Sequence, residues 1–133
     1  METFFTADTH FGHASILKHC TRPFTSVDEM DSALIENWNS TVSRKDSVYI
    51  LGDFAFRDHN QYLSRLQGRK ILILGNHDKM PDTVLRNFTD IFALKLIKLN
   101  KQEIFLCHYA MRTWQNCHNG SWSLFGHSHG RLQ

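Results

Sequence analysis

Residues 70–78, KILILGNHD, join a run of aliphatic side chains directly to a run of polar ones. The stretch Lys70–Leu74 is short, rich in β-branched and aliphatic residues, and ends at Gly75, which is typical of an interior strand followed by a turn. Asn76, His77 and Asp78 then offer side chains suited to metal binding or proton transfer. The stretch predicts a buried strand with a functional site at its carboxyl end.

Two earlier segments have the same design. TFFTA, at Thr3–Ala7, predicts a short buried strand that leads into Asp8. SVYIL, at Ser47–Leu51, predicts another strand that ends at Gly52. Three predicted strands are therefore each followed by polar residues.

Helices are predicted between these strands. Ser26–Val42 has apolar residues at helical spacing, and Ser26 with Glu29 forms the pattern of a capping box. HNQYLSRLQ, residues 59–67, predicts a second, short helix. Strands that alternate with helices indicate an α/β fold built around parallel strands.

The later part of the chain is richer in strands. FALKLIKL (Phe92–Leu99) and EIFLC (Glu103–Cys107) flank the polar NKQ, which predicts a hairpin, and SWSLF (Ser121–Phe125) predicts a last strand. We expect a single domain over residues 1–133, with one mixed sheet or two packed sheets and flanking helices.

Composition limits the classes of protein to consider. The chain has 133 residues, 41% hydrophobic and 21% charged, with a formal net charge of +2. This balance is ordinary for a globular domain and argues against a dedicated nucleic-acid surface. No apolar stretch would span a membrane, no secretory signal is recognisable, and Cys20, Cys107 and Cys117 suggest free thiols. We therefore expect a cytoplasmic protein without a membrane partner.

Candidate metal ligands follow each predicted strand. Side chains two positions apart on an extended segment point to the same side. Asp8 and His10 can therefore bind one ion, and His127 and His129 can reach two neighbouring ions. One ion does not need seven ligands, whereas two ions that share a bridging carboxylate do. The seven candidates are Asp8, His10, Asp53, Asn76, His108, His127 and His129.

The donor set consists of nitrogen and oxygen without sulfur. Such a set suits manganese, iron, zinc, cobalt or nickel better than calcium or copper(I). We expect two divalent transition-metal ions, with manganese as the first choice.

The order of these blocks resembles the calcineurin-like metallophosphoesterase superfamily, whose signature is D-x-H, G-D, G-N-H-[DE], a lone His and G-H-x-H. The chain carries all five blocks in that order, and they extend from residue 8 to residue 129: Asp8-Thr9-His10, Gly52-Asp53, Gly75-Asn76-His77-Asp78, His108 and Gly126-His127-Ser128-His129. DTHFGH and GDFAF look like the small single-domain members of bacteria and their phages.

The resemblance implies a role for each matched residue. Asp8, His10 and His129 would hold the first ion, Asp53 would bridge to the second, and three further ligands would complete it: Asn76, His108 and His127. His77 would not bind metal but would assist the leaving oxygen as a general acid, with its ring fixed by Asp78.

The reaction that the resemblance implies is hydrolysis of a phosphodiester or phosphomonoester by a metal-bridging hydroxide. The superfamily has no fixed substrate, and a nucleotide or another small phosphodiester is one candidate. The implied fold is two packed mixed sheets flanked by helices. Family members continue well past G-H-x-H, whereas four residues follow it here. We therefore expect an abbreviated second sheet, or a sheet edge covered by another subunit in a homo-oligomer.

Four further residues are candidates for contact with substrate phosphate. His13 and Arg22 lie near the first block, where a surface or local structural role is an equal alternative. Arg57 and Arg112 follow the second and fourth blocks, and a guanidinium group matches the geometry of phosphate. Surface placement is the alternative for both arginines.

Two other functions are compatible with parts of the sequence. Gly126-x-Ser128-x-Gly130 has the spacing of a serine-hydrolase nucleophile elbow, but the helix, acid and histidine that should follow it have no room in three residues. A catalytically silent metal-binding interaction module of the same fold is the main alternative. His77 argues against that module, because a structural site has no use for a free imidazole beside the metals.

Overall fold

In the computed structural model, which describes residues 1–132, the first four strands form one parallel sheet in the order β1-β2-β3-β4. The strands are β1 (Thr3–Thr6), β2 (Ser47–Ile50), β3 (Arg69–Ile73) and β4 (Asp90–Phe92). Each is paired in register with the next, so all four carboxyl ends lie at one edge of the sheet.

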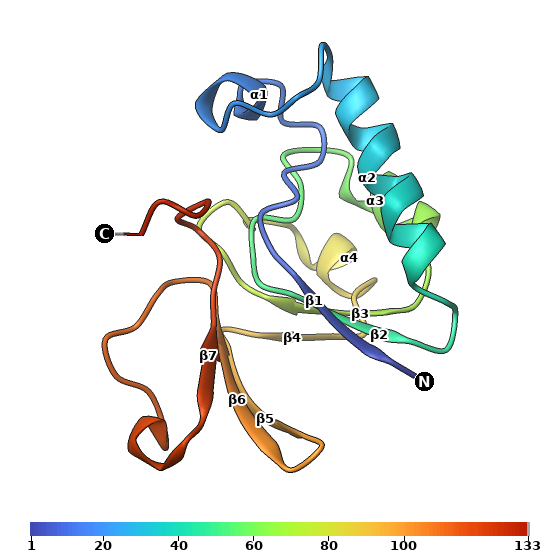
Figure 1. The fold of residues 1–133 in the computed structure, drawn as a ribbon. Helices are drawn as coiled ribbons and strands as arrows, with labels where there is room; N and C mark the ends of the chain where they lie inside the picture. Colours follow the sequence, from blue (N-terminus) through green and yellow to red (C-terminus); the bar gives the residue numbers. More distant parts are fainter. Residues whose placement is uncertain (133) are drawn as a thin grey trace.

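Helices connect these strands and cover one face of the sheet (Figure 1). They are α1 (Ile16–His19) and α2 (Val27–Thr41) before β2, α3 (His59–Arg65) before β3, and α4 (Asp82–Leu85) before β4. Parallel crossovers are right-handed, so a sheet wound in one direction places its helices on the same side. The larger core lies between helices and sheet, where Ile35, Trp38 and Leu63 pack with Ile50 and Leu72.

The second sheet packs on the opposite face, as Figure 1 shows. It contains β5 (Leu94–Leu99), β6 (Gln102–Cys107) and β7 (Trp122–Leu124), in that order, with β5 antiparallel and β7 parallel to β6. A short 3-10 helix, η1 (Cys117–Asn119), precedes β7. Ile73, Ile104 and Leu106 form the centre of the core between the two sheets.

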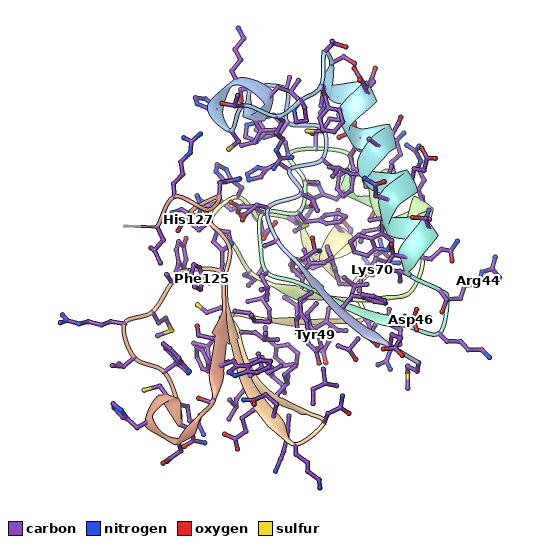
Figure 2. All side chains as sticks on the ribbon, in the orientation of Figure 1. Arg44, Asp46, Tyr49, Lys70, Phe125 and His127 are labelled. Atoms are coloured by element: carbon purple, nitrogen blue, oxygen red, sulfur yellow. The ribbon has the colours of Figure 1, made fainter. Side chains whose placement is uncertain are left out.

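Alternation along the parallel strands explains how one sheet supports two cores. In β2, Val48 and Ile50 face the helices, whereas Tyr49 faces the second sheet and stacks on Phe5 with ring centroids 5.6 Å apart. Figure 2 labels Tyr49 between the two sheets. The chain is therefore a mixed α/β fold with helices, a parallel sheet and a mixed sheet in successive layers.

The predicted elements are present with two corrections. The resemblance implies two mixed sheets, but the first sheet is parallel throughout. The single strand expected over Phe92–Leu99 is two strands, because β4 pairs with β3 in the first sheet and β5 pairs with β6 in the second. The change of sheet occurs at Ala93. The sequence pattern does not reveal this change, since both strands are partly buried.

The predicted capping box is half correct. The Ser26 hydroxyl accepts a hydrogen bond from the Glu29 N–H at 3.1 Å and so caps α2. The Glu29 carboxylate accepts from Thr25 N–H at 3.0 Å instead of from Ser26.

The three cysteines are free, as the sequence suggested.

Candidate metal centre

The five sequence blocks meet at the carboxyl edge of the parallel sheet. The segments after β1, β2 and β3 lie there side by side, and the segments after β6 and β7 join them. The Gly126 N–H donates to the His108 carbonyl at 2.9 Å, and the His127 N–H donates to both Asp8 carboxylate oxygens at 3.0–3.1 Å. Figure 2 shows His127 at the opposite end of the molecule from Asp46, which precedes β2.

Two groups of side chains at this edge could each hold a metal ion. Asp8, His10 and His129 form one group, and the other consists of Asp53, His108 and His127. Within each group the ligand atoms lie within 4.8 Å of one another. These six residues are among the seven that the sequence analysis selected.

Asp53 lies between the two groups. Its Oδ2 atom is 3.6 Å from His10 Nε2 in the first group and 3.4 Å from His108 Nε2 in the second. A single carboxylate oxygen thus faces an imidazole nitrogen of both groups, which is the arrangement that a bridging ligand requires.

Asn76, the seventh candidate, joins the second group. Its side-chain oxygen is 3.1 Å from His108 Nε2 and 3.2 Å from His127 Nδ1. An amide oxygen between two imidazole nitrogens adds a hard neutral donor to this group. The structure therefore brings all seven candidates together.

The backbone around these ligands is strained. Five of the seven have positive φ values between 49° and 67°: Asp8, His10, Asp53, His127 and His129. Residues other than glycine rarely adopt this conformation, and such strain gathers at functional sites where surrounding structure holds it. Backbone hydrogen bonds supply part of that hold, since the N–H groups of Asp8 and His10 donate to the carbonyls of Gly52 and Asp53 at 3.0 Å.

Three glycines of the motif blocks allow the close approach of the ligands. A Cβ atom at Gly52 would lie 2.3 Å from His108 Nδ1, one at Gly75 would lie 2.5 Å from Asp53 Oδ1, and one at Gly126 would lie 2.7 Å from Asp8 Oδ2. Any side chain at these positions would therefore overlap a ligand.

Burial and neighbouring groups shift the pKa values of His10 and Asp53 so that both are in the form that binds a cation. Desolvation lowers the pKa of His10 to about 3, so its ring is neutral, and its buried Nε2 has no hydrogen-bond partner within residues 1–132. Burial alone would raise the pKa of Asp53, but hydrogen bonds from His108 and the His77 N–H lower it to about 2. An ionised carboxylate beside an unpartnered nitrogen lone pair is a pair of groups that a cation would satisfy.

His108 and Asp8 have shifted pKa values for different reasons. Burial would lower the pKa of His108, but its hydrogen bonds to Asp53 and to the Leu51 carbonyl raise it. The Leu51 carbonyl accepts from His108 Nδ1 at 2.7 Å, which turns Nε2 toward Asp53 and Asn76. Desolvation raises the pKa of Asp8.

His77 is exposed at the mouth of the site. Its backbone N–H donates to Asp53 Oδ1 at 2.9 Å, and its ring centroid is 5.6 Å from that of His10 and 5.9 Å from that of His13. The ring lines a cleft of about 360 Å³ together with residues of both metal groups and of the α1 segment. His77 therefore lies in this cleft next to the candidate metal ligands.

The expected contact between Asp78 and the His77 ring is wrong. The buried Asp78 carboxylate accepts hydrogen bonds from the backbone N–H groups of Asp53, Phe54 and Gly75 at 2.7–3.0 Å. None of its hydrogen bonds within the described part of the chain reaches His77. Asp78 instead ties together the two turns that carry Asp53 and Asn76.

Arg22 makes local structural contacts, which is one of the alternatives that the sequence left open for it. Its guanidinium donates to the backbone carbonyls of Asp8 at 2.6 Å and Thr9 at 2.9 Å. It therefore supports the strained segment between the first two ligands. Sequence patterns do not reveal this role, because nothing local distinguishes an arginine that binds carbonyls from one that binds phosphate.

The other proposed substrate contacts lie in different places. His13 lines the cleft and meets His10, with the two Nδ1 atoms 3.1 Å apart. Arg57 is exposed, lies 3.9 Å from the Asp58 carboxylate and lines a separate depression beside α3. Arg112 is exposed in the segment between β6 and η1 and does not line the cleft. Neither arginine is placed at the metal centre.

Comparison with known proteins shows the family of the chain. No protein-family model matches it. It is 35% identical over 131 residues to the uncharacterized protein MJ1445 of Methanocaldococcus jannaschii, an alignment that covers 95% of this chain and 68% of the archaeal protein. The chain belongs to the family of this archaeal protein. It is also 38% identical over 82 residues to the gene 66 protein of Mycobacterium phage L5, covering 57% of this chain and 39% of the phage protein.

A solved structure shares the fold. The crystal structure of the protein of unknown function AQ665 from Aquifex aeolicus matches with a TM-score of 0.72 at 30% identity, over 90% of this chain and 67% of that chain. None of these names states an activity. Within residues 1–132, no helix is both long enough and apolar enough to cross a membrane.

Proposed function

We propose that this chain is a dinuclear metal-dependent phosphoesterase of the calcineurin-like metallophosphoesterase superfamily. The observation that carries the proposal is the position of Asp53 Oδ2, which lies 3.6 Å from His10 Nε2 and 3.4 Å from His108 Nε2. One carboxylate oxygen shared by two donor groups is the feature that separates a two-metal centre from two independent sites.

The fold supports this proposal at the level of architecture. Helices, a parallel sheet and a second sheet are stacked in that order, and the candidate ligands lie at the carboxyl ends of the strands. The five motif blocks occur in the order of the superfamily signature. The assignment to the calcineurin-like sandwich is part of the proposal.

The residues present fit two divalent ions. Asp8, His10 and His129 would hold the first, Asn76, His108 and His127 the second, and Asp53 both. The unpartnered Nε2 of His10 and the ionised Asp53 are the groups that a cation would satisfy. Imidazole, carboxylate and amide donors without sulfur suit Mn²⁺ or another transition metal. When bound, two such ions make water acidic near neutral pH and neutralise phosphate charge.

His77 is the general acid of the proposed reaction. It is exposed in the cleft, and its backbone N–H donates to Asp53 Oδ1, which holds the residue beside the proposed metal ligands. Protonation of the leaving oxygen by Nδ1 or Nε2 of this ring would assist cleavage of the ester bond. Asp78 would act only by fixing the backbone on which Asp53 and His77 stand.

The cleft favours a small substrate. Its volume is about 360 Å³, in the range of small-molecule sites, and its histidine lining would bind the phosphate group of a nucleotide or another small ester. The net charge of +2 offers no broad basic surface for a nucleic acid. The free cysteines fit a reducing, cytoplasmic setting.

The test is hydrolysis of bis(p-nitrophenyl) phosphate by the purified chain loaded with Mn²⁺. We expect His77→Ala to lower kcat by at least about 10²-fold while two ions still bind. We expect Asp53→Asn to lose both turnover and the two-ion stoichiometry. His118→Ala is the matched control, since His118 is exposed in η1, away from the cleft.

Two results would count against the proposal. If the wild-type chain binds fewer than two ions, the centre is not dinuclear. If the wild type and His77→Ala bind two ions but share the same trace turnover, the chain is the catalytically silent metal-binding module instead.

A further inference from the structure

His13 contacts the proposed metal ligand His10 through one nitrogen of each ring. Its Nδ1 atom lies 3.1 Å from Nδ1 of His10, which is hydrogen-bonding distance. The other ring nitrogen of His10, Nε2, is buried, has no partner within residues 1–132, and lies 3.6 Å from Asp53 Oδ2. The two nitrogens of His10 therefore face two different groups.

Neutral His10 and neutral His13 each carry one ring proton, and the contact between their Nδ1 atoms determines which nitrogen of each ring carries it. A neutral imidazole that binds a cation through Nε2 carries its only ring proton on Nδ1. His10 Nδ1–H must then donate to His13, and His13 Nδ1 must accept. The single proton of a neutral His13 is consequently on Nε2.

The His13 ring is itself held in place. It stacks on the Phe56 ring with centroids 4.8 Å apart and planes 13° from parallel. The Phe56 N–H donates to the Phe11 carbonyl at 2.8 Å, which fixes the backbone beneath the stack. The Phe56 side chain is nevertheless 61% exposed, so it is not part of the hydrophobic core. Stacking on His13 is the contact that accounts for an aromatic residue here.

We infer that His13 is a positioning residue for the first metal ion. By accepting from Nδ1–H it selects the tautomer of His10 and holds its Nε2 lone pair toward Asp53 and the ion. Phe56 supports His13 through the stacked rings. This role rests on the proposed dinuclear function, but it concerns metal affinity and can be measured without any turnover.

The first test compares Mn²⁺ affinity by titration calorimetry. We expect His13→Ala to bind two ions still, with affinity for one of them lowered by about 10–100-fold, the usual effect of removing an outer-shell partner. Asn places an oxygen near the Nδ1 position of histidine, so His13→Asn should restore most of the loss. His118→Ala is the control, because His118 is exposed in η1, away from the cleft. Phe56→Ala should lower the same affinity by a smaller factor.

The second test observes the ring protons of the Zn²⁺-loaded wild-type protein. Nitrogen-15 spectra of the histidine rings distinguish the two tautomers. We expect His10 with its proton on Nδ1 and His13 with its proton on Nε2. In His13→Asn, the His10 signals should keep the same tautomer.

The outcomes separate this role from its alternatives. Equal affinities in the wild type and His13→Ala, or the Nδ1–H tautomer for His13, would overturn it. Loss of one ion in both His13 variants would show that His13 is itself a ligand. A wild-type chain that binds no ions would refute the proposed function together with this role, whereas normal metal binding without turnover would refute only the phosphoesterase activity.

Discussion

Substitution of Gly52 by alanine tests whether the metal centre depends on close backbone approach. Gly52 has φ of +90°, and a Cβ atom there would lie 2.3 Å from His108 Nδ1 and 2.8 Å from the Gly75 Cα. His108 has no room to move, because its ring is completely buried and its Nδ1 contacts the Leu51 carbonyl at 2.7 Å. The added methyl group must therefore displace His108, a candidate metal ligand, or the adjacent turn.

Two contributions determine the size of the effect. A residue with a Cβ atom in the left-handed region costs about 1–2 kcal/mol, and forced overlap in a packed site costs a further ~1–3 kcal/mol. Gly120→Ala is the matched control, since Gly120 has φ of +87° but no atom within 4 Å of an added Cβ. We expect Gly52→Ala to lower the free energy of unfolding by about 2–5 kcal/mol, and Gly120→Ala by about 1–2 kcal/mol.

Urea unfolding of the metal-free proteins measures these losses, and Mn²⁺ titration measures the accompanying change in binding. We expect Gly52→Ala to lose the ion that His108 would hold, and Gly120→Ala to bind as the wild type does. Equal losses of stability in the two variants, with both ions retained in Gly52→Ala, would show that the close approach at His108 is not needed.

Three further predictions concern the groups around the ligands. The pKa of His10 is about 3 in the folded protein and 6.5 in the unfolded chain, so the unfolded chain binds more protons between these two pH values. The free energy of unfolding of the metal-free protein should therefore fall as the pH falls through this window. Urea melts of His10→Gln should show a less steep fall. Asp78→Ala leaves three backbone N–H groups unpaired and should lower the free energy of unfolding by about 3 kcal/mol or more in the same melts. A loss of kcat without a loss of stability would instead indicate that Asp78 fixes the His77 ring. Arg22→Lys cannot reproduce both carbonyl contacts and should lower Mn²⁺ affinity by about 10-fold in calorimetry, whereas unchanged affinity with a higher KM would indicate substrate binding.

The sequence predicted most of the local structure. The strands that precede Asp8, Asp53 and Asn76 were visible as short apolar runs, each followed by polar residues. Helix α2 was visible from its periodicity and from Ser26 at its start. These features depend on neighbours in the chain, so a single sequence contains the information.

The roles of the residues around the ligands could not be predicted in the same way. From the sequence, Arg57 and Arg112 were better placed to bind phosphate than Arg22, for which a local structural role was an equal alternative. In the structure Arg22 binds backbone carbonyls, and the other two arginines lie away from the centre. Asp78 follows His77 in the chain, but its carboxylate bonds to the turn after β2. Each of these contacts joins segments that are brought together only when the sheet forms.

The sequence by itself determined which side chains could bind a metal and which strands would carry them. The tertiary structure alone decided that Asp53 Oδ2 faces both His10 and His108, that β4 and β5 belong to different sheets, and that His13 meets His10. The physical reason is that hydrophobic periodicity records which side of an element is buried, whereas the distance between two polar atoms depends on the strained turns and close glycine contacts that link separate strands.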